Sequence, residues 1–170
     1  MDNTRLWVQT VLTTTPSRWL VLAGSLPAEM LVLRPNPQEW SAVECLQHLI
    51  DVEKVFQYRV ACFQQGVDFS AFNPDTQGTP FEDQSPTSLA LEFERMREQS
   101  LETIEALHSP DLDRSARHSE LGPVTLREML NEWAAHDLNH TVQAERVLMQ
   151  PFIASSGPWR VYFSDHILPV

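Results

Sequence analysis

Positive charge is scarce in this sequence. Only one of its 170 residues is a lysine, the eleven arginines are scattered, and the formal net charge is −11. Proteins that bind nucleic acids need clustered lysine and arginine to neutralise the phosphates. We therefore expect no nucleic-acid partner, and we expect any anionic ligand to be met by individual arginines rather than by a basic face.

Glycine, cysteine and long hydrophobic runs are scarce as well. Five glycines in a chain that is 42% hydrophobic indicate a globular, mostly helical protein. The two cysteines, Cys45 and Cys62, fall in one expected helix about 25 Å apart, too far for an intramolecular disulfide. No signal-peptide pattern opens the chain, and no apolar run approaches the ~20 residues that span a bilayer. We expect no membrane partner and a cytoplasmic location.

The periodicity of the apolar residues predicts an all-α fold, a four-helix bundle formed by one domain over residues 1–170. Prolines and capping motifs delimit the expected helices, which are 15–26, 41–65, 85–109 and 125–150, with a short helical piece at 6–12. The connections should be an extended segment at 27–40, a loop over a functional opening at 66–84, and an irregular polar segment at 112–123 with a turn at Gly122-Pro123. The aromatic and apolar tail, residues 152–170, is expected to pack against the bundle.

Three histidines stand on the apolar faces of two expected helices. His136 and His140 are four residues apart in a stripe that contains Met129 and Trp133, so both rings should point inwards. Burying imidazole groups without partners costs roughly 1–3 kcal/mol each. A shared metal ion explains both, because neutral histidine nitrogen is a common ligand and this spacing brings two rings to one point. His48, on the 41–65 helix, supplies a third ligand.

Three histidines from two helices leave coordination positions open, as in catalytic rather than structural zinc-type sites. A di-iron bundle would require Glu-x-x-His pairs. Glu44 and Glu132 each precede a histidine by four residues instead of three, and Glu44 already belongs to a capping box with Ser41. Asp51 and Asp137 are either carboxylates that orient the rings or solvated helix charges.

Other residues are given simpler interpretations. A bundle whose core histidines are satisfied without metal remains an alternative to the metal site. The remaining three histidines are expected to be solvated; they are His108, His118 and His166. Three arginines are the first candidates for a group that orients a substrate; they are Arg59, Arg127 and Arg160.

Four segments carry a resemblance to a known family. They are Arg34-Pro-Asn-Pro-Gln-Glu-Trp40-Ser41, Glu44-Cys-Leu-Gln-His48-Leu-Ile-Asp51, Trp133-Ala-Ala-His136-Asp137-Leu-Asn-His140 with Gln143 following, and Gly157-Pro-Trp-Arg160. The chain resembles the DinB-like superfamily of metal-binding four-helix bundles, which is related to thiol-dependent S-transferases that use bacillithiol or mycothiol. The resemblance implies a metal site at His48, His136 and His140.

These observations lead to a metal-dependent enzyme as the first hypothesis. One divalent ion would lower the pKa of a substrate thiol or water at an open coordination position. The sequence does not distinguish among zinc, nickel, iron and manganese. The resemblance implies S-transfer with a low-molecular-weight thiol as cofactor, whereas any open site permits hydrolysis of a small-molecule substrate. The alternative is a non-catalytic metal- or ligand-binding module. The family likeness also suggests a homodimer, which no residue pattern establishes.

Overall fold

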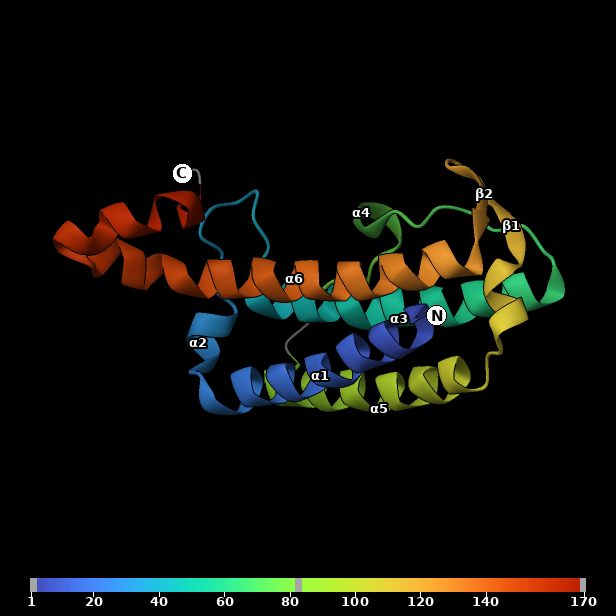
Figure 1. Cartoon of the computed structure of the whole chain (residues 1–170). Coiled ribbons are helices and arrows are strands. Elements are labelled where there is room, and N and C mark those ends of the chain that lie inside the picture. The colour runs from blue at the N-terminus through green and yellow to red at the C-terminus, as the bar shows by residue number, and fades with distance from the viewer. Residues whose placement is uncertain (1–2, 82–83, 169–170) are drawn as a thin grey trace.

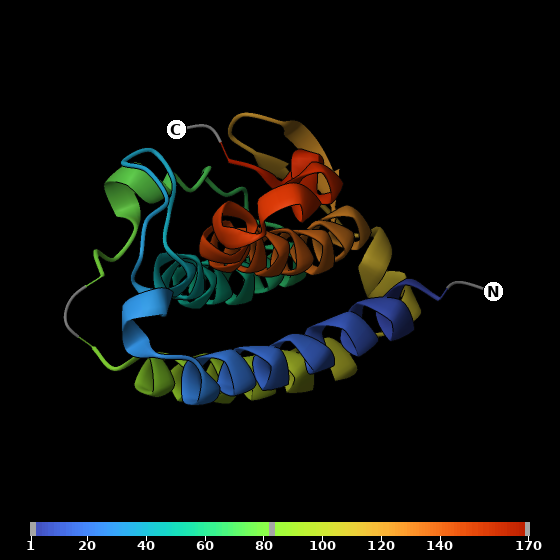
Figure 2. The ribbon, with the colours of Figure 1, turned by 90° about the vertical axis from the view of Figure 1, so that its left-hand side faces the viewer.

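The computed structural model describes residues 3–81 and 84–168; residues 82–83 of the expected loop and the first and last two residues of the chain lie outside the described residues. Four long helices form the bundle, and they are α1 (Thr4–Ser25), α3 (Ala42–Gln65), α5 (Pro86–Glu105) and α6 (Leu126–Ser155). Helix α1 packs beside α5 in one layer, and α3 packs beside α6 in the other (Figures 1 and 2). The predicted four-helix bundle is confirmed.

Short elements connect and extend the long helices. They are α2 (Ala28–Leu31), α4 (Pro74–Gln77), the 3₁₀-helices η1 (Ser109–Asp113) and η2 (Gly157–His166), and the strands β1 (Ser115–His118) and β2 (Gly122–Thr125). None of the helices in the described part of the chain combines the length and apolarity that crossing a bilayer requires.

Capping motifs set where α3 and α6 begin. The Ser41 hydroxyl accepts the backbone N–H of Glu44, and the Glu44 carboxylate accepts the backbone N–H of Ser41 at 2.9 Å. Thr125 and Glu128 form the same reciprocal pair at the start of α6. Each pair satisfies two donors that a helix terminus leaves free, which is why both starts could be predicted.

Apolar side chains from all four long helices fill the core. Helix α5 and its end bury Leu89, Phe93, Met96, Ile104 and Leu107. On α6 the predicted stripe is also buried, at Met129, Trp133, Ala144 and Val147. The inner face of α6 is therefore apolar around the positions of His136 and His140.

Helix α1 is continuous, so the predicted separation of residues 6–12 from 15–26 is wrong. Pro16 lies inside the helix and cannot donate to the carbonyl of Leu12 four residues earlier. That carbonyl accepts a hydrogen bond from Arg97 of α5 at 3.0 Å instead, so the proline leaves no buried acceptor unpaired. Helix α6 likewise continues through Pro151, and Ile153 extends its buried side.

The connections contain more regular structure than expected. Helix α2 lies within the expected extended segment 27–40, and α4 lies within the loop 66–84. The segment 112–123, expected to be irregular, contains part of an antiparallel hairpin in which His118 of β1 pairs with Gly122 of β2. Phe69 adds backbone hydrogen bonds to Arg117 and Ser119 of the hairpin, both at 3.0 Å. The hairpin is thereby fixed to the loop that follows α3.

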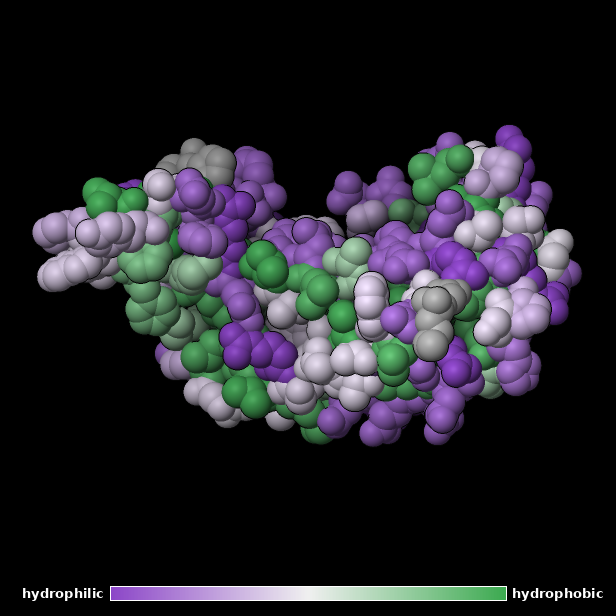
Figure 3. Space-filling model, in the orientation of Figure 1, coloured by the Kyte–Doolittle hydropathy of each residue, from purple (hydrophilic) through white to green (hydrophobic). Residues whose placement is uncertain are grey.

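The tail differs from the prediction that it packs down. The end formed by α6 and η2 projects beyond the other helices (Figures 1 and 3), and no residue of η2 is buried. Trp159 and Tyr162 are 66% and 78% exposed. Leu168 alone among the described residues after η2 is buried, because the backbone before it is held by Arg146 and Gln150 of α6.

Candidate metal centre

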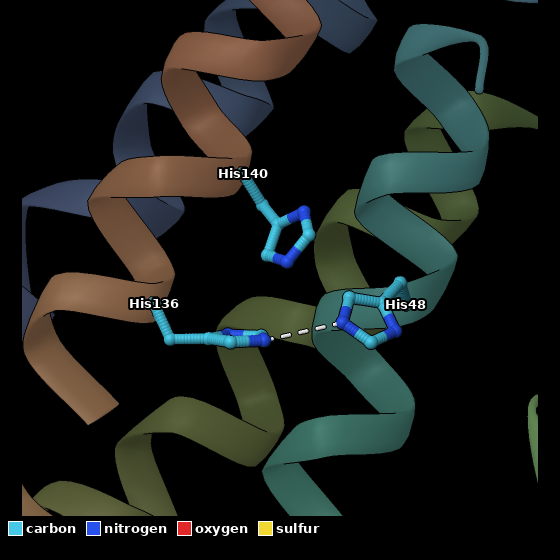
Figure 4. Close-up of side chains that lie close together, drawn as sticks. All are labelled: His48, His136 and His140. Carbon is cyan, nitrogen blue, oxygen red and sulfur yellow. Dashed lines mark hydrogen bonds between the residues drawn. The ribbon is translucent and has the colours of Figure 1, made fainter. Parts of the chain in front are cut away.

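The structure brings the three predicted histidines together between α3 and α6. His48 projects from α3, and His136 and His140 project from successive turns of α6 towards it (Figure 4). One ring nitrogen from each histidine lies within 4.8 Å of the other two. The ring centroids are 4.4 to 5.1 Å apart. Residues separated by 88 positions in the sequence thus share one site.

The spacing of the ring nitrogens suits a shared ion. Nε2 of His48 lies 3.2 Å from Nε2 of His136. Two nitrogen ligands at 2.0–2.1 Å from a tetrahedral zinc ion are about 3.3 Å apart. The donor set therefore fits a divalent ion, although metal ligation itself stays a prediction.

Burial keeps the three rings uncharged. Desolvation, together with the neighbouring His140, lowers the pKa of His48 to about 4. Desolvation and the same neighbour lower the pKa of His136 to about 3, and desolvation also lowers the pKa of His140. At neutral pH each ring is therefore neutral and has a lone pair to offer to a ligand.

Some ring nitrogens of the three histidines lack a hydrogen-bond partner among the described residues. Nδ1 of His140 bonds the side-chain oxygen of Gln143 at 2.8 Å, which places the ring proton on Nδ1 and leaves the Nε2 lone pair free. Nδ1 of His136 is buried and has no hydrogen-bond partner among the described residues. Core histidines that satisfy one another would account for the Nε2 contact of His48 and His136 but not for His140, whose Nε2 makes no hydrogen bond to a described residue.

Aromatic side chains and a cavity surround the rings. Trp40 lies 5.0 Å from His48 and 6.0 Å from His140 between ring centroids. Phe56 stacks on Trp133 at 4.6 Å below His136. The three histidines open into a cavity of about 310 Å³, whose wall includes Phe72 and Pro74 of the loop after α3. The loop thus borders the site, as predicted for a loop over an opening.

Neither aspartate that could have oriented the rings does so. Asp51 accepts hydrogen bonds from the backbone N–H of Thr79 at 2.7 Å and from its hydroxyl at 2.8 Å, which fastens the loop to α3. Asp137 is turned about 100° from His136 on the helix and faces the core instead. Among the described residues, Gln143 is the side chain that orients one of the rings.

Asp137 belongs to a buried cluster around Arg97, which the sequence analysis missed. The Arg97 guanidinium forms paired hydrogen bonds with Glu53 of α3, both at 2.9 Å, and with Asp137 of α6, at 2.7 and 3.0 Å. It also bonds Thr15 and Leu12 of α1, each at 3.0 Å. One residue of α5 therefore contacts the three other bundle helices.

A sequence signal for this cluster existed. Arg97 stands four residues after Phe93 and seven before Ile104, inside the apolar stripe of α5. An arginine at a core position requires buried acidic partners. The partners could not be chosen from the sequence, because they depend on how the helices are registered.

The other predicted residues fall in different places. Glu44 is engaged by Ser41 and by Arg34, whose Nε lies 2.8 Å from its carboxylate, so it is not a ligand of the histidine site. His118 is 8% exposed rather than solvated, because β1 packs it against Phe69. Arg127 pairs with Asp113. Arg160 is exposed at the tail.

Of the three candidate arginines, Arg59 borders the histidine cavity. It stands three turns after His48 on the same face of α3. It is half-buried and lines the cavity together with Trp40, Phe72 and Glu132. Arg59 is therefore the one prediction of a substrate-orienting group that the structure places beside the site.

Fold and site together define a four-helix bundle with a three-histidine centre between two of its helices. A sequence model described as the DinB superfamily matches residues 12–144, and the chain belongs to this superfamily. No curated protein matches the sequence significantly.

Two solved structures from Bacillus subtilis share the fold. YfiT, described as a probable metal-dependent hydrolase with an unusual four-helix bundle topology, superimposes with a TM-score of 0.75 at 14% identity, over 86% of this chain and 87% of that one. The DinB-like protein YjoA gives a TM-score of 0.58 at 17% identity, over 84% of this chain and 90% of that one. At these identities the likeness concerns the fold.

Proposed function

We propose that this protein is a metal-dependent enzyme in which His48, His136 and His140 bind one divalent ion. The observation that carries the proposal is the convergence of three neutral imidazoles on a cavity, with one ring nitrogen of each within 4.8 Å of the other two. Structural metal sites are closed by four protein ligands, whereas three leave room for a substrate.

The reaction we propose is hydrolysis or thiol S-transfer on a small molecule. The bound ion supplies Lewis acidity that lowers the pKa of a thiol or water. The protein supplies neutral ligands, which leave the charge of the ion uncompensated, and Gln143, which fixes the ring of His140. The description of YfiT as a probable hydrolase supports the first reaction, and the relation of the superfamily to thiol transferases supports the second.

Metal content tests the site. Protein purified without a histidine tag is loaded with zinc, nickel, iron or manganese, dialysed and subjected to elemental analysis. We expect about one ion per chain for the wild type and little for His140→Ala, because two ligands remain. His166→Ala, at an exposed histidine outside the site, is the matched control and should retain the ion. Equal metal content in wild type and His140→Ala would overturn the assignment.

Activity assays then separate the reactions. Metal-loaded protein is incubated with an electrophile and low-molecular-weight thiols, and separately with a panel of ester and amide substrates. A conjugate that forms with wild type and not with His140→Ala supports S-transfer, and metal-dependent cleavage supports hydrolysis. Stoichiometric metal without either product favours the alternative, a non-catalytic metal- or ligand-binding module.

A further inference from the structure

A second cavity adjoins the histidine cavity on the side of the β-hairpin. It measures about 320 Å³ and lies between β1, β2, the loop after α3 and the first turns of α6. Arg59, Phe72 and Glu132 line both cavities. The two spaces therefore adjoin along the groove between α3 and α6, with the histidines at one end and the hairpin at the other.

Arg59 stands at the junction with its hydrogen-bonding capacity largely unused. Its guanidinium carbon lies 5.3 Å from the ring centroid of Phe69 and 5.9 Å from that of Phe56. Its buried Nε has no partner among residues 3–81 and 84–168, and the one hydrogen bond that it makes there, from Nη2 to the carbonyl of Ser70, is 3.5 Å long. No carboxylate of the described residues lies within ion-pair distance of it.

Burial lowers the pKa of Arg59, and the charge of Glu132 raises it by less. The guanidinium is thus a cation that has lost water without gaining an equivalent anion. Its planar set of donors matches a carboxylate, which it can bind through two parallel hydrogen bonds.

His118 adds an uncharged donor to the same cavity. Its Nδ1 accepts the backbone N–H groups of Glu120 and Leu121, at 3.2 and 3.3 Å. A neutral imidazole that accepts at Nδ1 carries its proton on Nε2. Burial, with Arg59 close by, lowers the pKa of His118, which favours this neutral form. The hairpin therefore holds a histidine with one ring N–H in the wall of the cavity that Arg59 also lines.

The acidic residues around the cavity do not occupy Arg59. Glu128 accepts the backbone N–H of Thr125 at 2.7 Å in the helix cap. Glu120 is exposed at the rim, where water and salt screen its charge. Glu132 lines both cavities; desolvation raises its pKa, the charge of Arg59 lowers it by less, and no ion pair joins the two side chains in the described part of the chain. The negative charges of these glutamates repel anions in solution. They do not pair with the half-buried guanidinium of Arg59, which stays available to an anion that enters the groove.

We propose that Arg59 and His118 form a binding site for the carboxylate of a small organic molecule whose apolar body lies against Phe72 and Met129. That the rest of this molecule extends to the histidine centre and reacts there rests on the proposed function. The carboxylate site itself requires only the groove and can be tested without metal.

The test compares a carboxylate with its uncharged analogue. Metal-free protein is titrated with 4-phenylbutyrate and with 4-phenylbutanamide, and binding is followed by calorimetry and by NMR of the histidine rings. We expect the carboxylate to bind wild type at least about tenfold more tightly than the amide, and Arg59→Met to remove that preference. Arg95→Met, the same change at an exposed arginine of α5, should preserve it.

Two further variants test the geometry of the carboxylate site, and they keep the test informative if Arg59→Met fails to fold. Arg59→Lys keeps the charge but loses the planar donors, so it should weaken carboxylate binding several-fold. His118→Asn keeps an acceptor near the hairpin amides but removes the Nε2 donor, and should also weaken binding. Equal binding of acid and amide, or equal losses in Arg59→Met and Arg95→Met, would refute the site.

Metal content measured on the same samples separates the two proposals. If the variants at Arg59 bind metal like wild type and no carboxylate preference exists, the carboxylate site is refuted and the metal site stands. If the preference depends on Arg59 but wild type holds no ion, the metal-dependent function fails and the carboxylate site stands.

Discussion

The bundle contains two groups of buried polar side chains that differ in how completely they are paired. Around Arg97 every guanidinium N–H has an acceptor, and the acceptors come from α1, α3 and α6. His136 faces two other imidazoles, and one of its ring nitrogens has no partner among the described residues. Helices α3 and α6 contribute to both groups, since Glu53 and Asp137 stand on them as the histidines do.

Pairing, rather than burial, distinguishes a structural polar cluster from a binding site. Burial alone lowers the pKa of Arg97, but the hydrogen bonds and charges of Asp137 and Glu53 outweigh it and raise the pKa above its usual value. At His48 the charge of Asp51 raises the pKa but does not offset burial, and burial dominates at both His48 and His136. The first cluster is complete without a ligand, and the second is not.

Breaking the complete cluster should produce the largest effect. Arg97→Met leaves the buried carboxylates of Glu53 and Asp137 without a counter-charge, and removing one partner of a buried ion pair costs about 3–5 kcal/mol. We expect a loss of that size in the free energy of unfolding, measured by urea denaturation of metal-free protein. The triple variant with Glu53→Gln and Asp137→Asn should recover part of it. A loss below about 1 kcal/mol would show that the cluster is not structural.

Changing the partner of one histidine should have a smaller effect, on metal affinity. Gln143→Leu removes the oxygen that bonds Nδ1 of His140, and such supporting residues typically contribute 10–100-fold to metal affinity, which corresponds to about 1.4–2.7 kcal/mol. Competition with a chromophoric chelator measures the change. Gln99→Leu, at an exposed glutamine of α5, is the control. Unchanged affinity in Gln143→Leu would mean that the hydrogen bond does not orient the ring.

The sequence predicts the parts of the fold that depend on local patterns. The starts of α3 and α6 follow from the capping boxes at Ser41 and Thr125, whose partners are three residues away. The continuity of α1 through Pro16 cannot be predicted from a local pattern. Pro16 leaves the carbonyl of Leu12 without its helical donor, and the donor that replaces it is Arg97, 81 residues after the proline. The hairpin was missed for a similar reason, since the backbone of Phe69 supports its first strand.

In the candidate site, too, some residues can be predicted from the sequence and others depend on how the helices pack. His48, His136 and His140 could be selected because polar residues on apolar helix faces require partners. Their neighbours could not be assigned, because Asp51 turns to the loop and Asp137 to Arg97 once the helices pack. Likewise, Arg59 could be named as a candidate from its type alone, but its unpaired Nε depends on the cavity around it.

The smallest effect concerns the pH dependence of stability, which should differ between the two clusters. The pKa of His136 is about 3 in the folded protein and about 6.5 when unfolded, so below pH 6.5 the unfolded chain binds a proton that the folded chain refuses. Metal-free protein therefore loses stability as the pH falls from 6.5 towards 3, by at most about 1.4 kcal/mol for this histidine between pH 6.5 and 5.5.

Replacing His136 should remove that contribution. In urea denaturation at a series of pH values, His136→Gln should lose less stability than wild type between pH 6.5 and 5.5, whereas His166→Gln, at an exposed histidine, should follow wild type. Arg97→Met should change the profile in the opposite sense to the histidine, because the unpaired buried carboxylates of Glu53 and Asp137 take up protons in the folded protein as the pH falls. Identical pH profiles for His136→Gln and wild type would mean that His136 is solvated in the folded protein, and the contrast between the incomplete and the complete cluster would fail.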